Sequence, residues 1–154
     1  MIEYRRGNIF TSGAAALVSP VNCIGVMGKG LALEFKKRFP MMFEEYRQRC
    51  AGVYGFGAGK IMPIIIHGTS TIVINFSTKK HWKDNSRLEW VDAGLKELHN
   101  YLAARVMRKE NYKFSVAIPP LGCGLGGLKW EEVKLLIEKH LGNLEGVTVM
   151  VYEP

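Results

Sequence analysis

The chain has 154 residues, a formal net charge of +7 at pH 7 and three cysteines. This length predicts one domain spanning residues 1–154, large enough to bury a substantial core. No run approaches the roughly eighteen apolar residues of a transmembrane helix, and the first residues lack the apolar segment of a signal peptide. The widely spaced cysteines fit neither a disulfide framework nor a zinc site. We therefore expect a monomeric, cytoplasmic protein without a membrane segment, metal or cofactor.

Strands and helices are predicted to alternate along the chain. The long apolar strand runs predict an α/β fold, in which helices cover both faces of a mixed, mostly parallel central sheet. Ser86 is expected to cap the third helix, with Glu89 at the capping-box position. The expected strands are Ile2–Tyr4, Ala16–Val18, Ile61–Ile66, Thr71–Phe76, Phe114–Ile118 and Val147–Tyr152, and the expected helices are Leu31–Phe39, Met41–Cys50, Leu88–Leu102 and Trp130–Leu141.

A glycine-rich stretch, Pro119–Leu128, is the most informative segment. It follows the predicted strand Phe114–Ile118 and precedes a helix, so it leaves the carboxyl end of a strand, where open α/β sheets bind ligands. Glycines lack a Cβ, so the backbone can approach a ligand closely and point successive N–H groups at an anion. We predict a phosphate-binding loop here, although glycines also suit a merely tight connection.

A second loop of this kind, Asn22–Gly30, lies between a predicted strand and the helix that begins at Leu31. The unpaired amides and the dipole of a helix start favour an anion. Because Lys29 is followed by Gly30 and not by a hydroxyl residue, the loop is not a P-loop, and it does not match the dinucleotide-binding pattern either. Two glycine loops suit a ligand with two phosphates.

Basic residues form three clusters, at Lys36–Arg38, Lys79–Lys83 and Arg105–Lys109. Solvated helix faces explain much of this charge, including Arg105–Lys109. The cluster Lys79–Lys83 differs because it follows an apolar strand directly and contains Trp82. Basic groups beside an aromatic ring are typical of single-stranded nucleic acid sites.

The two glycine loops together resemble those of the macrodomain family of ADP-ribose binders, and the likeness covers nearly all 154 residues. Val21–Ala32 is similar to the ribose and diphosphate loop, Pro119–Leu128 to the second phosphate loop, and Gly7–Ile9 to the adenine-side motif. More narrowly, Val26–Ala32 and Asn75–Trp82 resemble the DarG antitoxin subfamily. That subfamily removes ADP-ribose from thymidine bases of single-stranded DNA, to which a DarT-type toxin adds it.

Three departures from the family pattern are visible. Asn8 stands where the family often has Asp, so the adenine contact loses a charge, and Ser19 replaces the first Asn of the usual Asn-x-x-Asn element. Gly126 stands where a related lysine-dependent class, the terminal ADP-ribose protein glycohydrolases, carries Asp. A carboxylate at that position therefore cannot assist the reaction, and more of the chemistry falls to a lysine.

The resemblance implies the site residues. Lys80 is expected to be catalytic, either as an ammonium that protonates the departing base or as a neutral amine that attacks the ribose, and Asn22 is expected to hold the distal ribose. The DNA-contact candidates are Lys79, His81, Trp82 and Lys83. The residues expected to bind ADP-ribose are Asn8, Ile9, Asn22, Gly28, Gly30, Leu31, Thr78, Pro120, Leu121, Gly122, Cys123, Gly124, Leu125 and Gly126.

The implied activity is hydrolysis of ADP-ribose from thymidine bases of single-stranded DNA. The implied partner is a DarT-type toxin, which a segment beyond Pro154 would bind if the chain is the N-terminal part of a longer antitoxin. Two alternatives stay open. One is an enzyme that acts on protein-linked or O-acetyl ADP-ribose, against which the missing acid at position 126 counts. The other is a non-catalytic ADP-ribose reader, in which Lys80 is dispensable.

Overall fold

A six-stranded sheet forms the centre of the computed structural model, which describes residues 1–107 and 113–154. Arg108 and Lys109 of the third basic cluster lie outside these described residues. The strand order is β1-β6-β5-β2-β4-β3, and every neighbouring pair is parallel except β3 and β4. The strands are β1 (Ile2–Arg5), β2 (Ala16–Val21), β3 (Ile61–Ile65), β4 (Ile72–Ser77), β5 (Phe114–Ile118) and β6 (Val147–Tyr152).

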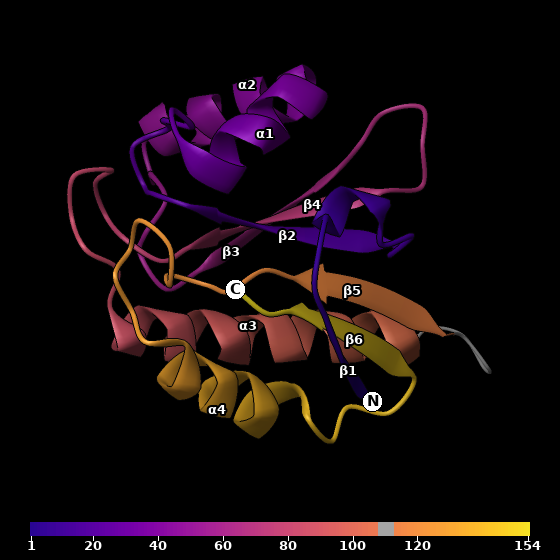
Figure 1. Cartoon of the computed structure of the whole chain (residues 1–154). Helices are drawn as coiled ribbons and strands as arrows, with labels where there is room; N and C mark the ends of the chain where they lie inside the picture. Colours follow the sequence, from indigo (N-terminus) through magenta and orange to yellow (C-terminus); the bar gives the residue numbers. More distant parts are fainter. Residues whose placement is uncertain (108–112) are drawn as a thin grey trace.

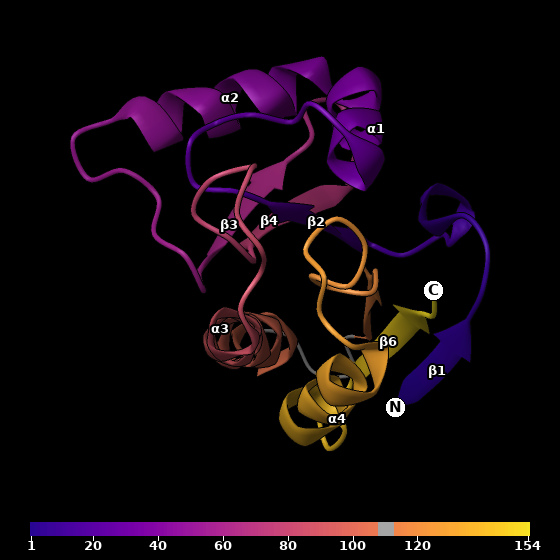
Figure 2. The ribbon, with the colours of Figure 1, turned by 60° about the vertical axis from the view of Figure 1, so that its left-hand side comes forward.

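Helices cover both faces of this sheet (Figure 1, Figure 2). Helices α1 (Gly30–Arg38) and α2 (Pro40–Ala51) lie on one face, and α3 (Leu88–Met107) and α4 (Trp130–Leu141) lie on the other. A short 3₁₀ helix, η1 (Ile9–Thr11), follows β1. The predicted mixed, mostly parallel α/β sheet is confirmed. None of the described helices is long and apolar enough to cross a membrane.

Successive side chains of a strand point to opposite faces of the sheet, and here the side chains on both faces are apolar because helices cover both. In β4, Ile72, Ile74 and Phe76 join the core under α3 and α4, whereas Val73 joins the core under α1 and α2. All six residues of β4 are buried. This burial on two sides explains why the strands appear in the sequence as continuous apolar runs rather than as alternating patterns.

The predicted cap of the third helix is wrong, although the helix begins where its apolar pattern begins. Helix α3 begins at Leu88, and the Ser86 hydroxyl donates instead to Thr78 Oγ1 at 3.0 Å. The Glu89 carboxylate accepts a hydrogen bond from Arg87 Nη1 at 3.0 Å. Ser86 and Glu89 therefore do not form a capping box, because Thr78, at the start of the same segment, competes for the Ser86 side chain.

Candidate functional site

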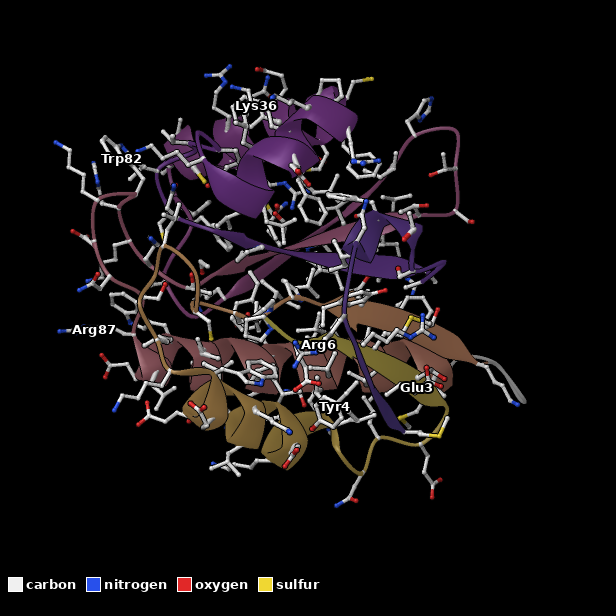
Figure 3. All side chains as sticks on the ribbon, in the orientation of Figure 1. Glu3, Tyr4, Arg6, Lys36, Trp82 and Arg87 are labelled. Carbon is white, nitrogen blue, oxygen red and sulfur yellow. The ribbon has the colours of Figure 1, made fainter. Side chains whose placement is uncertain are left out.

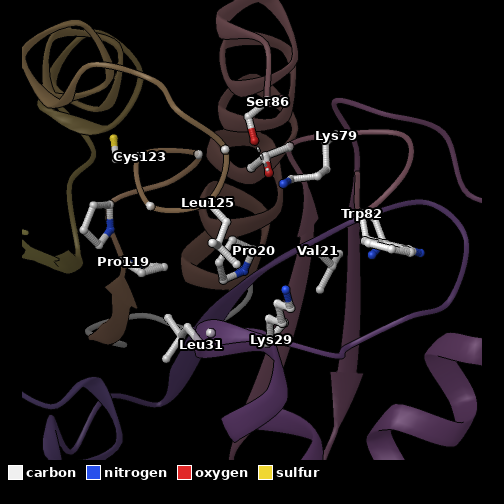
Figure 4. A pocket seen from close by; sticks show the side chains of 18 of the residues that line it. Pro20, Val21, Lys29, Leu31, Lys79, Trp82, Ser86, Pro119, Cys123 and Leu125 are labelled. Carbon is white, nitrogen blue, oxygen red and sulfur yellow. Dashed lines mark hydrogen bonds between the residues drawn. The ribbon is translucent and has the colours of Figure 1, made fainter. Parts of the chain in front are cut away.

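The three central parallel strands place three loops side by side. β5, β2 and β4 are neighbours in the sheet, so the segments that follow them leave the same edge. Ligands bind at this edge in open α/β sheets. A pocket of about 640 Å³ lies there, between loop 22–29, segment 78–87 and loop 119–129 (Figure 4).

The pocket contains most of the residues expected to bind ADP-ribose. It is lined by Asn22, Gly28, Gly30, Leu31, Thr78, Pro120, Gly122, Cys123, Gly124, Leu125 and Gly126 among the expected ligand contacts, and by Lys79 and Trp82 among the expected DNA contacts. Val21, Val26, Lys29, Ala32 and Pro119 also line it; they belong to the two predicted ligand loops but were not singled out. The sequence analysis missed Pro20, Ser86 and Pro154, which complete the lining. Pro20 and Pro154 follow from the strand order, since β2 and β6 end at this edge.

Asn22 shapes the first loop. Its buried side-chain Oδ1 accepts from Ile24 N at 3.1 Å and from Val26 N at 3.4 Å, and its Nδ2 donates to Val26 O at 2.8 Å. The Tyr46 hydroxyl donates to the Asn22 carbonyl oxygen at 2.8 Å. The amide thus folds its own loop around itself. Its expected contact with the distal ribose stays a prediction.

The start of α1 faces the pocket without a side-chain cap. Lys29 occupies the N-cap position and makes no side-chain cap hydrogen bond, while Gly30, Leu31 and Ala32 of the first turn line the pocket. Gly30 has a φ of 59°, a left-handed conformation that favours glycine. Uncapped first-turn amides together with the helix dipole form a site for an anion.

The second loop presents a row of free amides. Cys123 N donates to Pro120 O, Gly127 N to Gly124 O, and Leu128 N to Gly122 O, at 3.0, 3.2 and 2.9 Å. Within residues 1–107 and 113–154, the N–H groups of the three residues 124–126 have no such acceptor. The same three residues line the pocket, so their free amides are available to an anion such as a phosphate.

Gly126 is held against the segment that follows β4. Its carbonyl oxygen accepts from Ser86 N at 2.9 Å, and the Ser86 hydroxyl donates to Thr78 Oγ1. A Cβ at position 126 would overlap with Ser86 Oγ and would lie 2.5 Å from Gly122 O. No side chain fits at this position without displacing the loop, so glycine is required here for space.

The two adjacent lysines have different environments. Lys79 is partly buried and lines the pocket, and its side chain projects into the space between the loops (Figure 4). Lys80 is exposed, does not line the pocket, and places its Nζ 5.7 Å from the centroid of the Trp90 ring. The catalytic role expected for Lys80 stays a prediction, but the geometry favours its neighbour.

Burial also changes the acidity of Lys79. Desolvation lowers the pKa of its ammonium, and nearby Asp84 opposes this effect in part. A lowered pKa makes the ammonium a stronger proton donor and increases the fraction of neutral amine. Both properties suit a catalytic lysine. Lys29 projects into the same pocket from the other side (Figure 4).

The remaining expected contacts lie outside the pocket lining. Asn8 caps η1, where its Oδ1 accepts from Phe10 N at 2.9 Å, and Ile9 and Leu121 are buried in the cores. His81 and Lys83 lie beyond the pocket wall, beside Trp82. Sequence patterns locate the motif, but they do not tell which of its residues point inward.

The three cysteines are unpaired, and Cys123 lines the pocket. Burial raises the pKa of the Cys123 thiol to about 11, and burial also raises the pKa of Cys23. Raised thiol pKa values oppose the thiolate that a nucleophile requires. Among the described residues, no group of three His, Cys, Asp or Glu side chains is arranged to hold a metal ion.

Comparison with known proteins agrees with this geometry. The Macro domain family model matches residues 18–137. A DNA ADP-ribosyl glycohydrolase of Thermus aquaticus is 42% identical over 160 residues, which cover 100% of this chain and 41% of that protein. The chain therefore spans less than half the length of this curated relative.

Solved structures show the same similarity. The macrodomain of Mycobacterium tuberculosis DarG superposes with a TM-score of 0.89 at 40% identity, covering 100% of this chain and 98% of that one. Thermosipho africanus DarTG in complex with ADP-ribose superposes with a TM-score of 0.85 at 31% identity, covering 99% of this chain and 41% of that one. With the two glycine loops, the sheet and the pocket, these matches establish that the chain belongs to the macrodomain family.

Proposed function

We propose that this chain hydrolyses the bond between ADP-ribose and thymine bases of single-stranded DNA, and so reverses the action of a DarT-type toxin. The observation that carries the proposal is the partly buried amine of Lys79, which projects into a pocket with two amide-lined loops. The 42% identity to a DNA ADP-ribosyl glycohydrolase over the whole chain supports the same substrate.

In this proposal the pocket offers backbone amides to the diphosphate and an ammonium to the departing base. In the proposed complex, the diphosphate of ADP-ribose binds the amides of loop 119–129 and of the α1 start, and the distal ribose lies near Asn22. The transition state places positive charge on the ribose and negative charge on the departing base. An ammonium beside the leaving group stabilises that charge or neutralises it by proton transfer.

The step balances as a hydrolysis. Water oxygen bonds to ribose C1″ as the bond from C1″ to the thymine ring nitrogen breaks, and the electron pair of that bond stays on the nitrogen. The nitrogen takes a proton from the Lys79 ammonium, and the proton released by the attacking water restores it. In the alternative route, which a lowered pKa favours, the neutral Lys79 amine bonds to C1″ as the bond from C1″ to the thymine nitrogen breaks, and a proton of the amine passes to that nitrogen. Water then hydrolyses the ribosyl-lysine, which releases ADP-ribose and restores the free amine.

Substitution of the two lysines in parallel tests the assignment. Lys79→Ala should lose at least the ~100-fold in turnover typical of one acid–base or electrostatic group, with little change in affinity for free ADP-ribose, which lacks the departing base. Lys80→Ala is the matched comparison. Loss of turnover in Lys80→Ala with retention in Lys79→Ala would return the chemistry to Lys80. Borohydride trapping distinguishes a ribosyl-lysine from a proton donor.

The substrate is tested separately. Thymine-modified oligonucleotide, glutamate-modified peptide and O-acetyl ADP-ribose are incubated side by side with the protein. Release only from the oligonucleotide supports the proposal. Faster release from the peptide or the acetyl ester would favour the protein-directed alternative, and tight ADP-ribose binding without any release would favour a reader.

The proposal also covers the cellular compartment, the oligomeric state and the partner protein. We propose a reducing cytoplasm, which the three unpaired cysteines support, and a monomer in solution. The proposed partner is a DarT-type toxin, since the chain is 40% identical to the macrodomain of a DarG. Mass measurement in solution, alone and with such a toxin, tests both statements.

A further inference from the structure

A surface of aromatic rings and cations, residues 80–90, adjoins the mouth of the pocket. Trp82 lies at the pocket edge and is 48% exposed, and its ring lies 5.3 Å from the His81 ring and 5.1 Å from Lys83 Nζ. Figure 3 shows Trp82 and Arg87 on the same side of the molecule. The surface is therefore continuous with the pocket and open to solvent.

Trp90 supports the second half of this surface. The Lys80 ammonium lies 5.7 Å and the Arg87 guanidinium 5.3 Å from the centroid of its ring. A cation over an indole is held by the charge distribution of the ring. Trp90 thus positions two cations, from different parts of one loop, at the start of α3.

Residues 80–90 carry a net positive charge that is exposed to solvent. They include three basic side chains, Lys80, Lys83 and Arg87, against two carboxylates, Asp84 and Glu89. Arg87 pairs with Glu89 at 3.0 Å, but their side chains are 63% and 64% exposed. Such an exposed pair adds little free energy, so a phosphate can displace the carboxylate.

We propose that this surface binds the single-stranded DNA that flanks the modified base, with a neighbouring base stacked on Trp82 and phosphates bound by Lys83, Lys80 and Arg87. Stacking on an exposed ring beside cations that follow the backbone is the way proteins bind single strands without reading their sequence. The inference rests on the proposed function, because it assigns the part of that substrate that lies outside the pocket.

Substrate length tests the inference. ADP-ribosylated thymidine fits the pocket alone, whereas a modified oligonucleotide also reaches residues 80–90. The oligonucleotide should therefore show a KM at least threefold lower and a steeper salt dependence, by about 0.7 log units per log unit of salt for each phosphate contacted. Equal KM values and equal salt slopes for the two substrates would overturn the inference.

Single substitutions locate the contact. Arg87→Gln and Lys83→Gln should each raise the KM of the oligonucleotide at least threefold and lower its salt slope by about 0.7, and leave ADP-ribosylated thymidine unaffected. Lys139→Gln is the matched control, because Lys139 is 66% exposed and pairs with Asp92 at 3.7 Å on another part of the surface. Effects no larger than those of Lys139→Gln would overturn the inference.

The two proposals fail in different ways. If neither substrate is hydrolysed, the proposed function fails, and fluorescence anisotropy with the modified oligonucleotide still measures the surface through dissociation constants and their salt slopes. If both substrates are hydrolysed without dependence on length, the proposed function stands and the DNA surface is wrong.

Discussion

Substitution of Gly124 by glutamate gives a direct test of the diphosphate position. Gly124 lines the pocket, its φ is not in the left-handed region, and a Cβ there would have no heavy atom within 4 Å. The backbone therefore accepts a side chain, and a surface change of this kind alters the free energy of unfolding by no more than about 0.5 kcal/mol. Any effect on binding then comes from the pocket and not from misfolding.

The expected loss of affinity follows from charge. A glutamate carboxylate about 6 Å from one phosphate charge is repelled by roughly 3 kcal/mol at an effective dielectric constant of about 20. Solvent and salt screen an open pocket, so we expect a rise in the Kd of ADP-ribose of about 10-fold to 100-fold. Titration calorimetry measures this change directly.

Two controls separate bulk from charge. Gly124→Gln adds nearly the same volume without the charge and should cost less affinity, while Gly124→Ala should change neither binding nor the melting temperature appreciably. An unchanged Kd in a Gly124→Glu variant that melts like the wild type would refute the placement of the diphosphate against loop 119–129.

Two further predictions concern packing and acidity. A Cβ on Gly94 in α3 would overlap with the buried Phe76 ring, so Gly94→Ala should lower the melting temperature by roughly 2–6 °C. Helix propensity alone predicts the opposite, a gain in stability of about 1 kcal/mol. A higher melting temperature in a thermal melt would therefore contradict this packing. Burial raises the pKa of Cys123 to about 11, so the rate of its alkylation, followed by peptide mapping, should rise about tenfold per pH unit up to that value. Bound ADP-ribose should slow the alkylation, because Cys123 lines the pocket. A rate that levels off near pH 9 would contradict the raised pKa.

The fold was predictable because the sheet is covered on both sides. Burial of both faces makes each strand a continuous apolar run, and the loops after such strands in a parallel sheet leave the same edge. The stretches Asn22–Gly30 and Pro119–Leu128 could therefore be placed in one site without knowing the strand order. Pro154 could not, because its place in the site depends on β6 lying beside β5.

In an irregular loop, no periodic pattern in the sequence shows which way a side chain points. Lys79 and Lys80 are adjacent and chemically alike, and no spacing rule says which one faces the pocket. The loop is fixed by hydrogen bonds between distant segments: Thr78 N donates to Val21 O at 3.1 Å, and Cys23 N donates to Lys80 O at 2.9 Å. These contacts orient the segment so that Lys79 projects inward, and only the structure reveals them.

The position of Ser86 explains two findings: Ser86 does not cap α3, and position 126 carries glycine instead of an acidic residue. The Ser86 hydroxyl reaches across to Thr78, directly before Lys79, and it occupies the space that a side chain at position 126 would need. One small polar residue thus anchors the lysine segment and at the same time requires Gly126 on the opposite loop. A carboxylate at position 126 is therefore incompatible with this arrangement of Ser86, so the proposed reaction has to take its proton from another group, and the proposal assigns that role to the amine of Lys79.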